Sequence, residues 1–354
     1  MLWVNLPMFI LIFAGLYFYK ADSSSGRLLI YKVAATMLKD NWQVGIGQGQ
    51  FKVKYNLAQA QYFSKHSIDS KEMLLADNTF YAFNDFYQFV IEHGVMGFVF
   101  IITILYFLNK QIKTLHEHEA HKSLFTSAVA SLICILVGAL FSYPLQMFPI
   151  IFQFIFCFAL INSFGVTEKN YTVSLNGSKW YRAFILTISI LLTIHFWFYF
   201  NYKNKSLYAF ELSKSGFKTK AISRYKELSN CYIKEGNDLF EYSRELYYSN
   251  QLQEAKKMLS IAKKYYSSNE VYKLSASIEA ELKNYKQAEG DLKTVINMVP
   301  NRMQSRLNMV EFYLEQKDTA NARYWANSII NMPVKIISPT TSGIQKRAKE
   351  ILSE

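Results

Sequence analysis

The chain has 354 residues, of which 51% are hydrophobic, and a formal net charge of +12 at pH 7. Its long apolar runs nearly all precede Tyr202, so the composition predicts a membrane part followed by a helical soluble part. Lys and Arg lie beside the apolar runs or are scattered beyond them. This distribution argues against nucleic acid as a partner and favours binding to anionic lipid headgroups or phosphorylated substrates.

Five stretches have about the 20 apolar residues that cross a hydrocarbon core of about 30 Å. The first lacks a basic start and a small-residue cleavage site before Lys20, so we expect a retained span rather than a signal peptide. The predicted fold is all-α and begins with a polytopic transmembrane helix bundle. Its spans are Leu2–Tyr19, Phe89–Leu108, Leu124–Tyr143, Met147–Phe164 and Ala183–Tyr202.

The short loops predict the orientation of this bundle. Asn109–Lys122 and Gly165–Arg182 are basic, whereas the turn Ser142–Phe148 has no charge. Basic short loops favour the cytoplasm. We therefore expect the loop Lys20–Gln88 and the C-terminal part to lie outside the cytoplasmic membrane. Lys203 and Lys205, just after the last span, mildly favour the opposite orientation.

The loop Lys20–Gln88 is too long and too patterned to be a mere connector. After Arg27, the segment Leu28–Trp42 has apolar residues at helical spacing and is expected to lie along the membrane surface. A Gly-x-Gly-x-Gly segment and two lysines follow. Alternate glycines allow close backbone approach and present N–H groups that suit a diphosphate, and a plain tight turn is the alternative. These candidate binding residues are Gly45, Gly47, Gly49, Lys52 and Lys54.

The end of the loop carries a second candidate group just before the second predicted span. Asn84 and Asp85 are polar residues at the point where a lipid-linked substrate would present its head, and a helix cap is the alternative role. Gly94 and Gly97 follow and would let helices approach closely, which needs no chemistry.

The histidine-rich segment His116-Glu-His118-Glu-Ala-His121 contains metal-ligating residue types in a short loop. The spacing is not an HExxH, and charged turns between spans are common. We predict neither a metal site nor a cofactor.

Beyond Tyr208 the sequence repeats, with alanines at intervals of 34, 33 and 34 residues. Pro300 and Pro333 close two of the units. The pattern resembles the tetratricopeptide repeat, in which a small alanine lets two helices cross closely. We expect residues 203–354 to form an α-solenoid with a concave groove, serving as a tether or binding a protein partner. The alanines are Ala221, Ala255, Ala288 and Ala322.

The order of motifs carries a further resemblance. Ser-Gly-Arg27, then Gly-x-Gly-x-Gly49-x-Phe51, a polar loop, and Ala-Phe-Asn84-Asp85-Phe before Gly94-x-x-Gly97 and a span resemble the C-terminal half of the membrane domain of the O-antigen ligase and polymerase superfamily. The repeat tail resembles that of members from Bacteroidetes. Residues 1–202 would then be part of a GT-C-type membrane domain.

This resemblance implies a metal-independent glycosyltransferase of the bacterial inner membrane. It would move a glycan from an undecaprenyl-diphosphate donor to a hydroxyl of lipid A-core or of another glycan. Arg27 matches the arginine that helps to hold the donor diphosphate, which suits the paired donors of a guanidinium.

Where many relatives carry a histidine proposed to activate the acceptor, this chain has Phe83, which cannot accept a proton. Three alternatives follow: Asp85 serves as the base, another residue serves as the base, or the chain is inactive. Members also have further spans before the Ser-Gly-Arg segment, so the chain is expected to be a shortened product, a fragment or half of a split enzyme. The alternative function is a non-catalytic, membrane-anchored repeat scaffold.

Overall fold

The structure is a computed structural model that describes residues 21–39, 41–65, 71–115, 122–164, 179–231 and 235–353. All regular elements in these ranges are helices, so the predicted all-α class is confirmed. The predicted span Leu2–Tyr19 and the segment His116–His121 lie outside the described residues.

The chain divides into two compact units. The first comprises Met1–Phe100, Ala139–Tyr143 and Ser267–Glu354, and the second comprises Ile101–Gly138 and Pro144–Tyr266. Each unit is described separately below.

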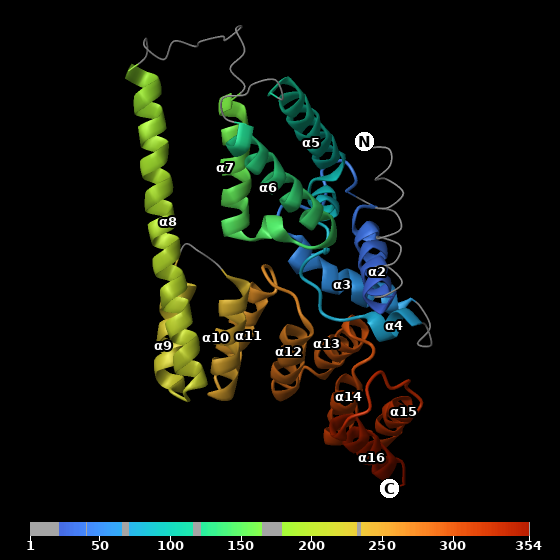
Figure 1. Ribbon diagram of the computed structural model, residues 1–354. Coiled ribbons are helices and arrows are strands. Elements are labelled where there is room, and N and C mark those ends of the chain that lie inside the picture. Colours follow the sequence, from blue (N-terminus) through green and yellow to red (C-terminus); the bar gives the residue numbers. More distant parts are fainter. Residues whose placement is uncertain are drawn as a thin grey trace. The chain divides into compact units, whose positions relative to one another are not determined.

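The first unit joins the loop between the first two predicted spans to the C-terminal helices (Figure 1). Helix α3 packs on α2 and on α13, which is distant in sequence. A core of Leu29, Val33, Phe51, Tyr55 and Ile91 holds the loop helices together. The helices of this unit are α2 (Ala21–Met37), α3 (Phe51–Ser64), α4 (Lys71–Leu75), the start of α5 (Asp85–Leu115), α12 (Asn269–Glu281), α13 (Tyr285–Met298), α14 (Met303–Glu315), α15 (Thr319–Ile330) and α16 (Pro339–Ser353).

The second unit contains most of the apolar helices and two helix pairs that follow them. Helix α8 packs on α9, and α10 packs on both α9 and α11. The elements of this unit are the remainder of α5, most of α6 (Lys122–Phe141), the 3-10 helix η1 (Pro144–Gln146), α7 (Phe148–Phe164), α8 (Lys179–Lys214), α9 (Lys218–Ser229), α10 (Gly236–Tyr248) and α11 (Leu252–Ala262).

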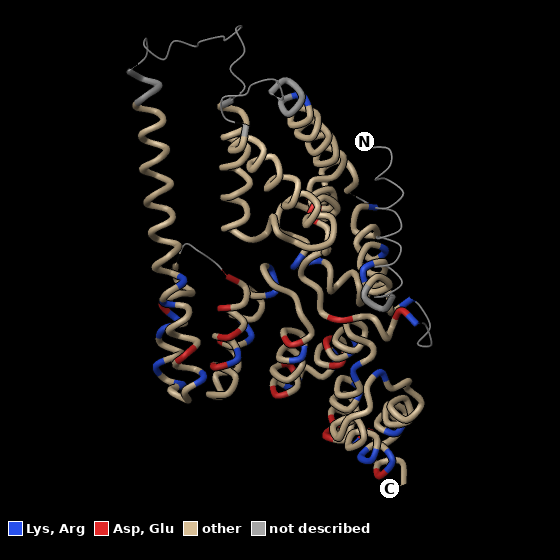
Figure 2. Tube along the Cα trace, in the orientation of Figure 1, with Lys and Arg blue, Asp and Glu red and all other residues tan. Residues whose placement is uncertain are grey.

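Three described helices are long and apolar enough to cross a membrane: Asp85–Lys110, Ser123–Phe141 and Ala183–Lys214. The helix Phe148–Ser163 is apolar but shorter. Figure 2 shows hardly any charged residues on α6, α7 and the first part of α8, whereas they are frequent on α9 to α16. These helices are compatible with a membrane protein. The compartment and the topology of the chain stay predictions.

Helix α8 runs without interruption through the predicted domain boundary at residues 202 and 203. Its first part is apolar and exposed, whereas Tyr202 and Ala209 are buried by the helices that follow. No Gly or Pro interrupts the sequence until Gly216, whose positive φ of 80° follows the helix end. One helix therefore joins the apolar part to the first helix pair with no flexible linker.

The repeated alanines lie where the periodicity places them. Each is fully buried and belongs to the second helix of an antiparallel pair. A methyl side chain at these positions lets the paired helices pack closely. The pairs are α8 with α9, α10 with α11, α12 with α13, and α14 with α15, and their stacking into one solenoid stays a prediction.

Candidate functional site

The glycine segment after α2 packs against the start of α5. Gly45 has a φ of 73°, and a Cβ there would lie 2.3 Å from the Glu92 carbonyl oxygen. Gly94 has a φ of 63°, and its Cβ would lie 2.5 Å from the carbonyl carbon of Gln43. Both glycines are needed because two backbone segments meet here at a distance that excludes a side chain.

Backbone hydrogen bonds join these two segments. The N–H of Ile46 donates to the Ile91 carbonyl at 3.1 Å, and the N–H of Gly47 donates to the Glu92 carbonyl at 3.0 Å. In the reverse direction, the N–H of Val95 donates to the Trp42 carbonyl at 2.9 Å.

The Glu92 carboxylate completes this junction. It accepts hydrogen bonds from the N–H of Gly49 at 2.9 Å and of Phe51 at 3.2 Å, at the start of α3. A carboxylate at a helix N-terminus satisfies donors that the helix itself leaves open. The N–H groups of Gly47 and Gly49, predicted to meet a phosphate, thus donate within the protein. Lys54 donates to the Ile46 carbonyl at 2.9 Å, and Lys52 is exposed.

Asn84 and Asp85 lie at the start of α5. The Asn84 side-chain oxygen accepts from the Tyr87 N–H at 2.9 Å, which is an N-cap contact. Asp85 is 4% exposed in the first helical turn. The preceding Phe83 has a φ of 55°, a strained value for a large side chain.

A cavity of about 480 Å³ lies within the first unit. Its wall comes from α2, from α3, from the segment between α4 and α5, and from the segment between α15 and α16. The polar and aromatic side chains that line it are Arg27, Gln59, Asp77, Asn78, Thr79, Phe83 and Lys335. Among the predicted site residues, Arg27 reaches this cavity, whereas the glycines, Asn84 and Asp85 do not line it.

Arg27 is held above an aromatic wall. Its guanidinium carbon lies 5.8 Å from the centre of the Phe83 ring, within the range of a cation–π contact. The Phe83 ring meets Tyr143 edge-on at 5.6 Å, and Tyr143 stacks on Tyr81 at 4.3 Å. Arg27 has no hydrogen bond or ion pair to another described residue, so its paired N–H donors are open to a ligand.

Helix α2, which carries Arg27, is fixed on both sides. The Tyr87 hydroxyl donates to the Tyr31 carbonyl at 2.7 Å. Lys32 forms an ion pair with Glu72 of α4 at 2.9 Å. Hydrogen bonds with Tyr62 and Glu72 raise the pKa of Lys32 above its ordinary value, so the cation persists at neutral pH.

Helix α3 carries a buried polar network beside the cavity. Gln59, which is 1% exposed, donates to the Asp77 carbonyl at 3.0 Å and to the Met298 carbonyl at 2.5 Å. Asn56 is fully buried, donates to the Ser267 carbonyl at 2.8 Å and accepts from the Thr79 N–H at 2.9 Å. Buried amides are tolerated because their donors and acceptors are satisfied.

The segment before α5 is bound to the C-terminal helices by further contacts. Asn301 donates to the carbonyls of Leu74 at 3.1 Å and of Ala76 at 2.8 Å. Arg302 pairs with the Asp77 carboxylate at 3.1 Å, and Asn78 hydrogen-bonds Asn269. Residues 74–78 are thus held against residues 269–302, which are distant in sequence.

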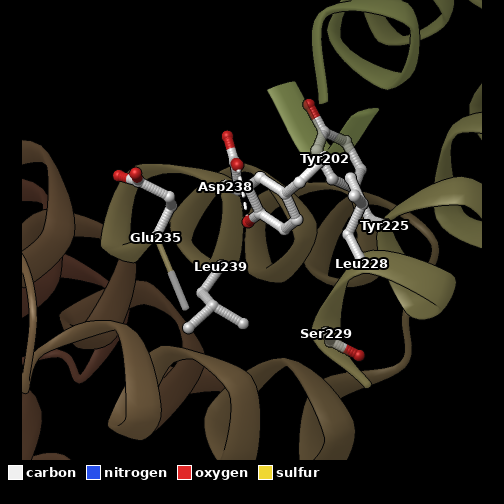
Figure 3. Close-up of a pocket in the computed structure, with 7 residues that line it drawn as sticks. All are labelled: Tyr202, Tyr225, Leu228, Ser229, Glu235, Asp238 and Leu239. Carbon is white, nitrogen blue, oxygen red and sulfur yellow. Dashed lines mark hydrogen bonds between the residues drawn. The ribbon is translucent and has the colours of Figure 1, made fainter. Parts of the chain in front are cut away.

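A second group of polar residues, in the second unit, is a packed joint (Figure 3). The hydroxyls of Tyr202 and Ser206 each donate to the Asp238 carboxylate at 2.8 Å, and Lys203 pairs with Glu235 at 3.1 Å. The seven described residues of Figure 3 leave no room for a water molecule between them. This joint fixes α10 to α8 and is no ligand site.

Within the described ranges, no group of three or more His, Cys, Asp or Glu side chains is placed to hold a metal ion. The polar residues of the cavity wall that sequence reasoning missed are Gln59, Asp77, Asn78, Thr79 and Lys335. A polar pair three residues apart on α3, Asn56 and Gln59, was a signal for buried contacts, but nothing local marks Lys335.

Comparisons with known proteins show a likeness to solved structures. The chain is similar to the crystal structure of a tetratricopeptide repeat protein from Parabacteroides merdae ATCC 43184, with 15% sequence identity and a TM-score of 0.37. The match covers 43% of this chain and 59% of that chain, so it spans about three-fifths of that structure's length. No protein-family model and no curated protein matches the chain.

Proposed function

We propose that the chain is a membrane glycosyltransferase of O-antigen ligase or polymerase type, which takes its glycan from an undecaprenyl-diphosphate donor. One observation carries the proposal: Arg27 and Phe83, 56 residues apart in the sequence, meet at a cavity of about 480 Å³. In the family that the motifs resemble, these two positions serve the donor and the acceptor.

The chemistry requires one bond to form and one to break. An acceptor hydroxyl oxygen attacks the anomeric carbon of the donor sugar, the bond from that carbon to the diphosphate breaks, and the hydroxyl proton passes to a base. Arg27 stabilises the charge that develops on the leaving diphosphate. Asp85, two residues after Phe83, is the base that we propose from the order of motifs; it is 4% exposed and lies outside the cavity wall, in the helix turn that Asn84 caps.

The glycine segment has a supporting role in this proposal. Its close contact with residues 91–95 fixes the start of α5 and hence the position of Phe83, Asn84 and Asp85. Catalysis depends on such fixed geometry. Lys52 and Lys54 lie on the following helix and add positive charge to this part of the unit.

The contacts of the first unit also support a topology. Asn78 bonds Asn269, which supports our proposal that the chain before α5 and the chain after α8 lie on one side of the membrane. On this proposal an even number of crossings separates them, and α7 crosses along with α5, α6 and α8. Its 17 residues span about 25 Å, which a bilayer accommodates by local thinning.

We further propose that this side is the periplasm of a bacterium with an inner membrane, because the stretches 109–122 and 165–182 are basic. Single cysteines at Lys52 and at Asp318, in a chain without Cys134, Cys157 and Cys231, test this. Both should react with an impermeant reagent added outside the cytoplasm. Labelling of only one of them would refute the even number of crossings.

A non-catalytic repeat scaffold is the second candidate function. It is favoured by the structural roles of the predicted site residues, since Gly47 and Gly49 donate to Glu92 and Asn84 caps α5. These contacts account for the residues without any ligand.

Glycan transfer in cells distinguishes the two functions. The chromosomal copy is deleted and replaced by the wild type, Arg27→Ala, Asp85→Asn or, as a control on an exposed helix face, Lys346→Gln. Surface glycan attached to its acceptor should be restored by the wild type and the control alone. Restoration by Arg27→Ala and Asp85→Asn, at equal protein levels, would exclude the transferase and leave the scaffold.

A further inference from the structure

Lys335 lies in the segment between α15 and α16, more than 300 residues from Arg27 in sequence, and lines the same cavity. Two cations and one carboxylate, Asp77, thus face this space. Arg302 forms ion pairs with Asp77 at 3.1 Å and with Glu270 at 3.7 Å, so these five side chains together carry one excess positive charge. The cavity therefore has a net positive potential that favours an anion.

The segment that carries Lys335 is held in place. Met332 is 5% exposed and belongs to the core of α14 to α16, and Val334 packs against that core. On the other side, Ser338 and Thr341 cap α16 reciprocally, with N–H to hydroxyl distances of 2.9 and 3.2 Å. The backbone of Lys335 is thus fixed between a buried side and a helix cap.

Neither cation has an ion pair or hydrogen bond to another described residue; Arg27 is half-buried and Lys335 is exposed. An arginine and a lysine that converge on one space with their donors open suit a polyanion with oxygens on two centres. A diphosphate has this form.

We infer that Lys335 and Arg27 form a two-cation site for the diphosphate of the substrate, so that the C-terminal helical region contributes directly to ligand binding. This inference rests on the proposed function for the identity of its ligand. Ile336 and Ile337 follow Lys335 and are 68% and 85% exposed, which gives apolar surface beside the cation. That surface favours a diphosphate attached to a lipid over the free anion.

Binding to the purified full chain in detergent tests the inference. The probes are undecaprenyl diphosphate, inorganic pyrophosphate and undecaprenol, titrated against the wild type, Arg27→Gln, Lys335→Gln and Lys346→Gln. Lys346 is an exposed lysine of α16 that does not line the cavity, so it controls for the loss of one positive charge.

We expect Arg27→Gln and Lys335→Gln each to weaken undecaprenyl diphosphate binding about tenfold or more, as the loss of a charged hydrogen bond predicts. Lys346→Gln should bind as the wild type, and undecaprenol should bind at least tenfold more weakly than the diphosphate to all four chains. Changing Ile336 and Ile337 to serine should weaken the lipid-linked probe and leave pyrophosphate unaffected.

Wild-type affinity in Lys335→Gln, or equal losses in Lys335→Gln and Lys346→Gln, would overturn the inference. Equal affinity for pyrophosphate and the lipid-linked probe would overturn the lipid-linked source. The outcome is separable from the proposed function, because a chain that binds the diphosphate through both cations but transfers no glycan in cells refutes the transferase and retains the site.

Discussion

The glycine junction predicts that two substitutions of the same kind differ sharply in cost. Gly45 and Gly49 have nearly equal φ values, 73° and 69°, so alanine in either place costs about 1–2 kcal/mol for a left-handed conformation. At Gly49 no atom lies within 4 Å of the added Cβ, whereas at Gly45 it would overlap the Glu92 carbonyl.

Relief of that overlap must separate the two segments. Three backbone hydrogen bonds would then be lost, those of Ile46, Gly47 and Val95. Each contributes about 0.5–1.5 kcal/mol net, so Gly45→Ala should cost about 3–6 kcal/mol in total. That is a large part of the stability of an ordinary domain, about 5–15 kcal/mol.

Hydrogen–deuterium exchange of the detergent-solubilised full chain measures this difference locally. In Gly45→Ala the amides of Ile46, Gly47 and Val95 should lose their protection and the melting temperature should fall, whereas Gly49→Ala should change both only slightly. Equal effects of the two substitutions would refute the close backbone contact.

Three further predictions concern buried polar groups. Glu92→Gln places the NH₂ of an amide against one of two backbone N–H donors, so it should lower the free energy of unfolding by about 2 kcal/mol, the loss of one charged hydrogen bond. The melting temperature should fall accordingly, and an unchanged melting temperature would contradict the carboxylate cap. Burial raises the pKa of Glu241, so this group stabilises the fold below its unfolded pKa of 4.5 and loses that contribution as pH rises through the raised value. Glu241→Gln should therefore melt higher than the wild type at pH 7 and equal to it near pH 4, and the opposite pH trend would refute the assignment. Arg306 is 2% exposed, burial lowers its pKa, and its Nε has no partner among the described residues. Arg306→Met should therefore melt at the same temperature as the wild type or at a higher one. A fall of several degrees would contradict this and reveal an essential contact of Arg306.

The sequence predicted the features that depend on local pattern. Hydropathy over about 20 residues located the long apolar helices, and the alanine period located the buried crossing points of the helix pairs. Both patterns can be recognised from the sequence, because they reflect helical geometry and burial rather than contacts between particular distant residues.

The candidate site needed contacts that sequence spacing does not encode. The glycine segment is visible in the sequence, but its bond to Glu92 joins residues 43 apart. A phosphate-binding loop and a closed backbone junction have the same glycine pattern, so the pattern does not distinguish them. Helix α3 docks on α13 through Gln59 and on the segment before α12 through Asn56, and no local pattern marks this docking or the place of Lys335 at the cavity. Helix α8 continues past Tyr202, where the last apolar run ends, because no Gly or Pro follows until Gly216. The division of the chain at residues 202 and 203 stays a prediction.

The central claim is that the cavity between Arg27 and Lys335 holds the diphosphate of a lipid-linked glycan. Photo-crosslinking from position 78 tests it most directly, since Asn78 lines the cavity and carries no charge. A photoreactive residue at Asn78 should label undecaprenyl-diphosphate glycan in membranes, and the label should disappear in the Arg27→Gln background, while the same residue at Lys346 should give none. Equal labelling from both positions, or labelling at Asn78 that persists without Arg27, would contradict the account.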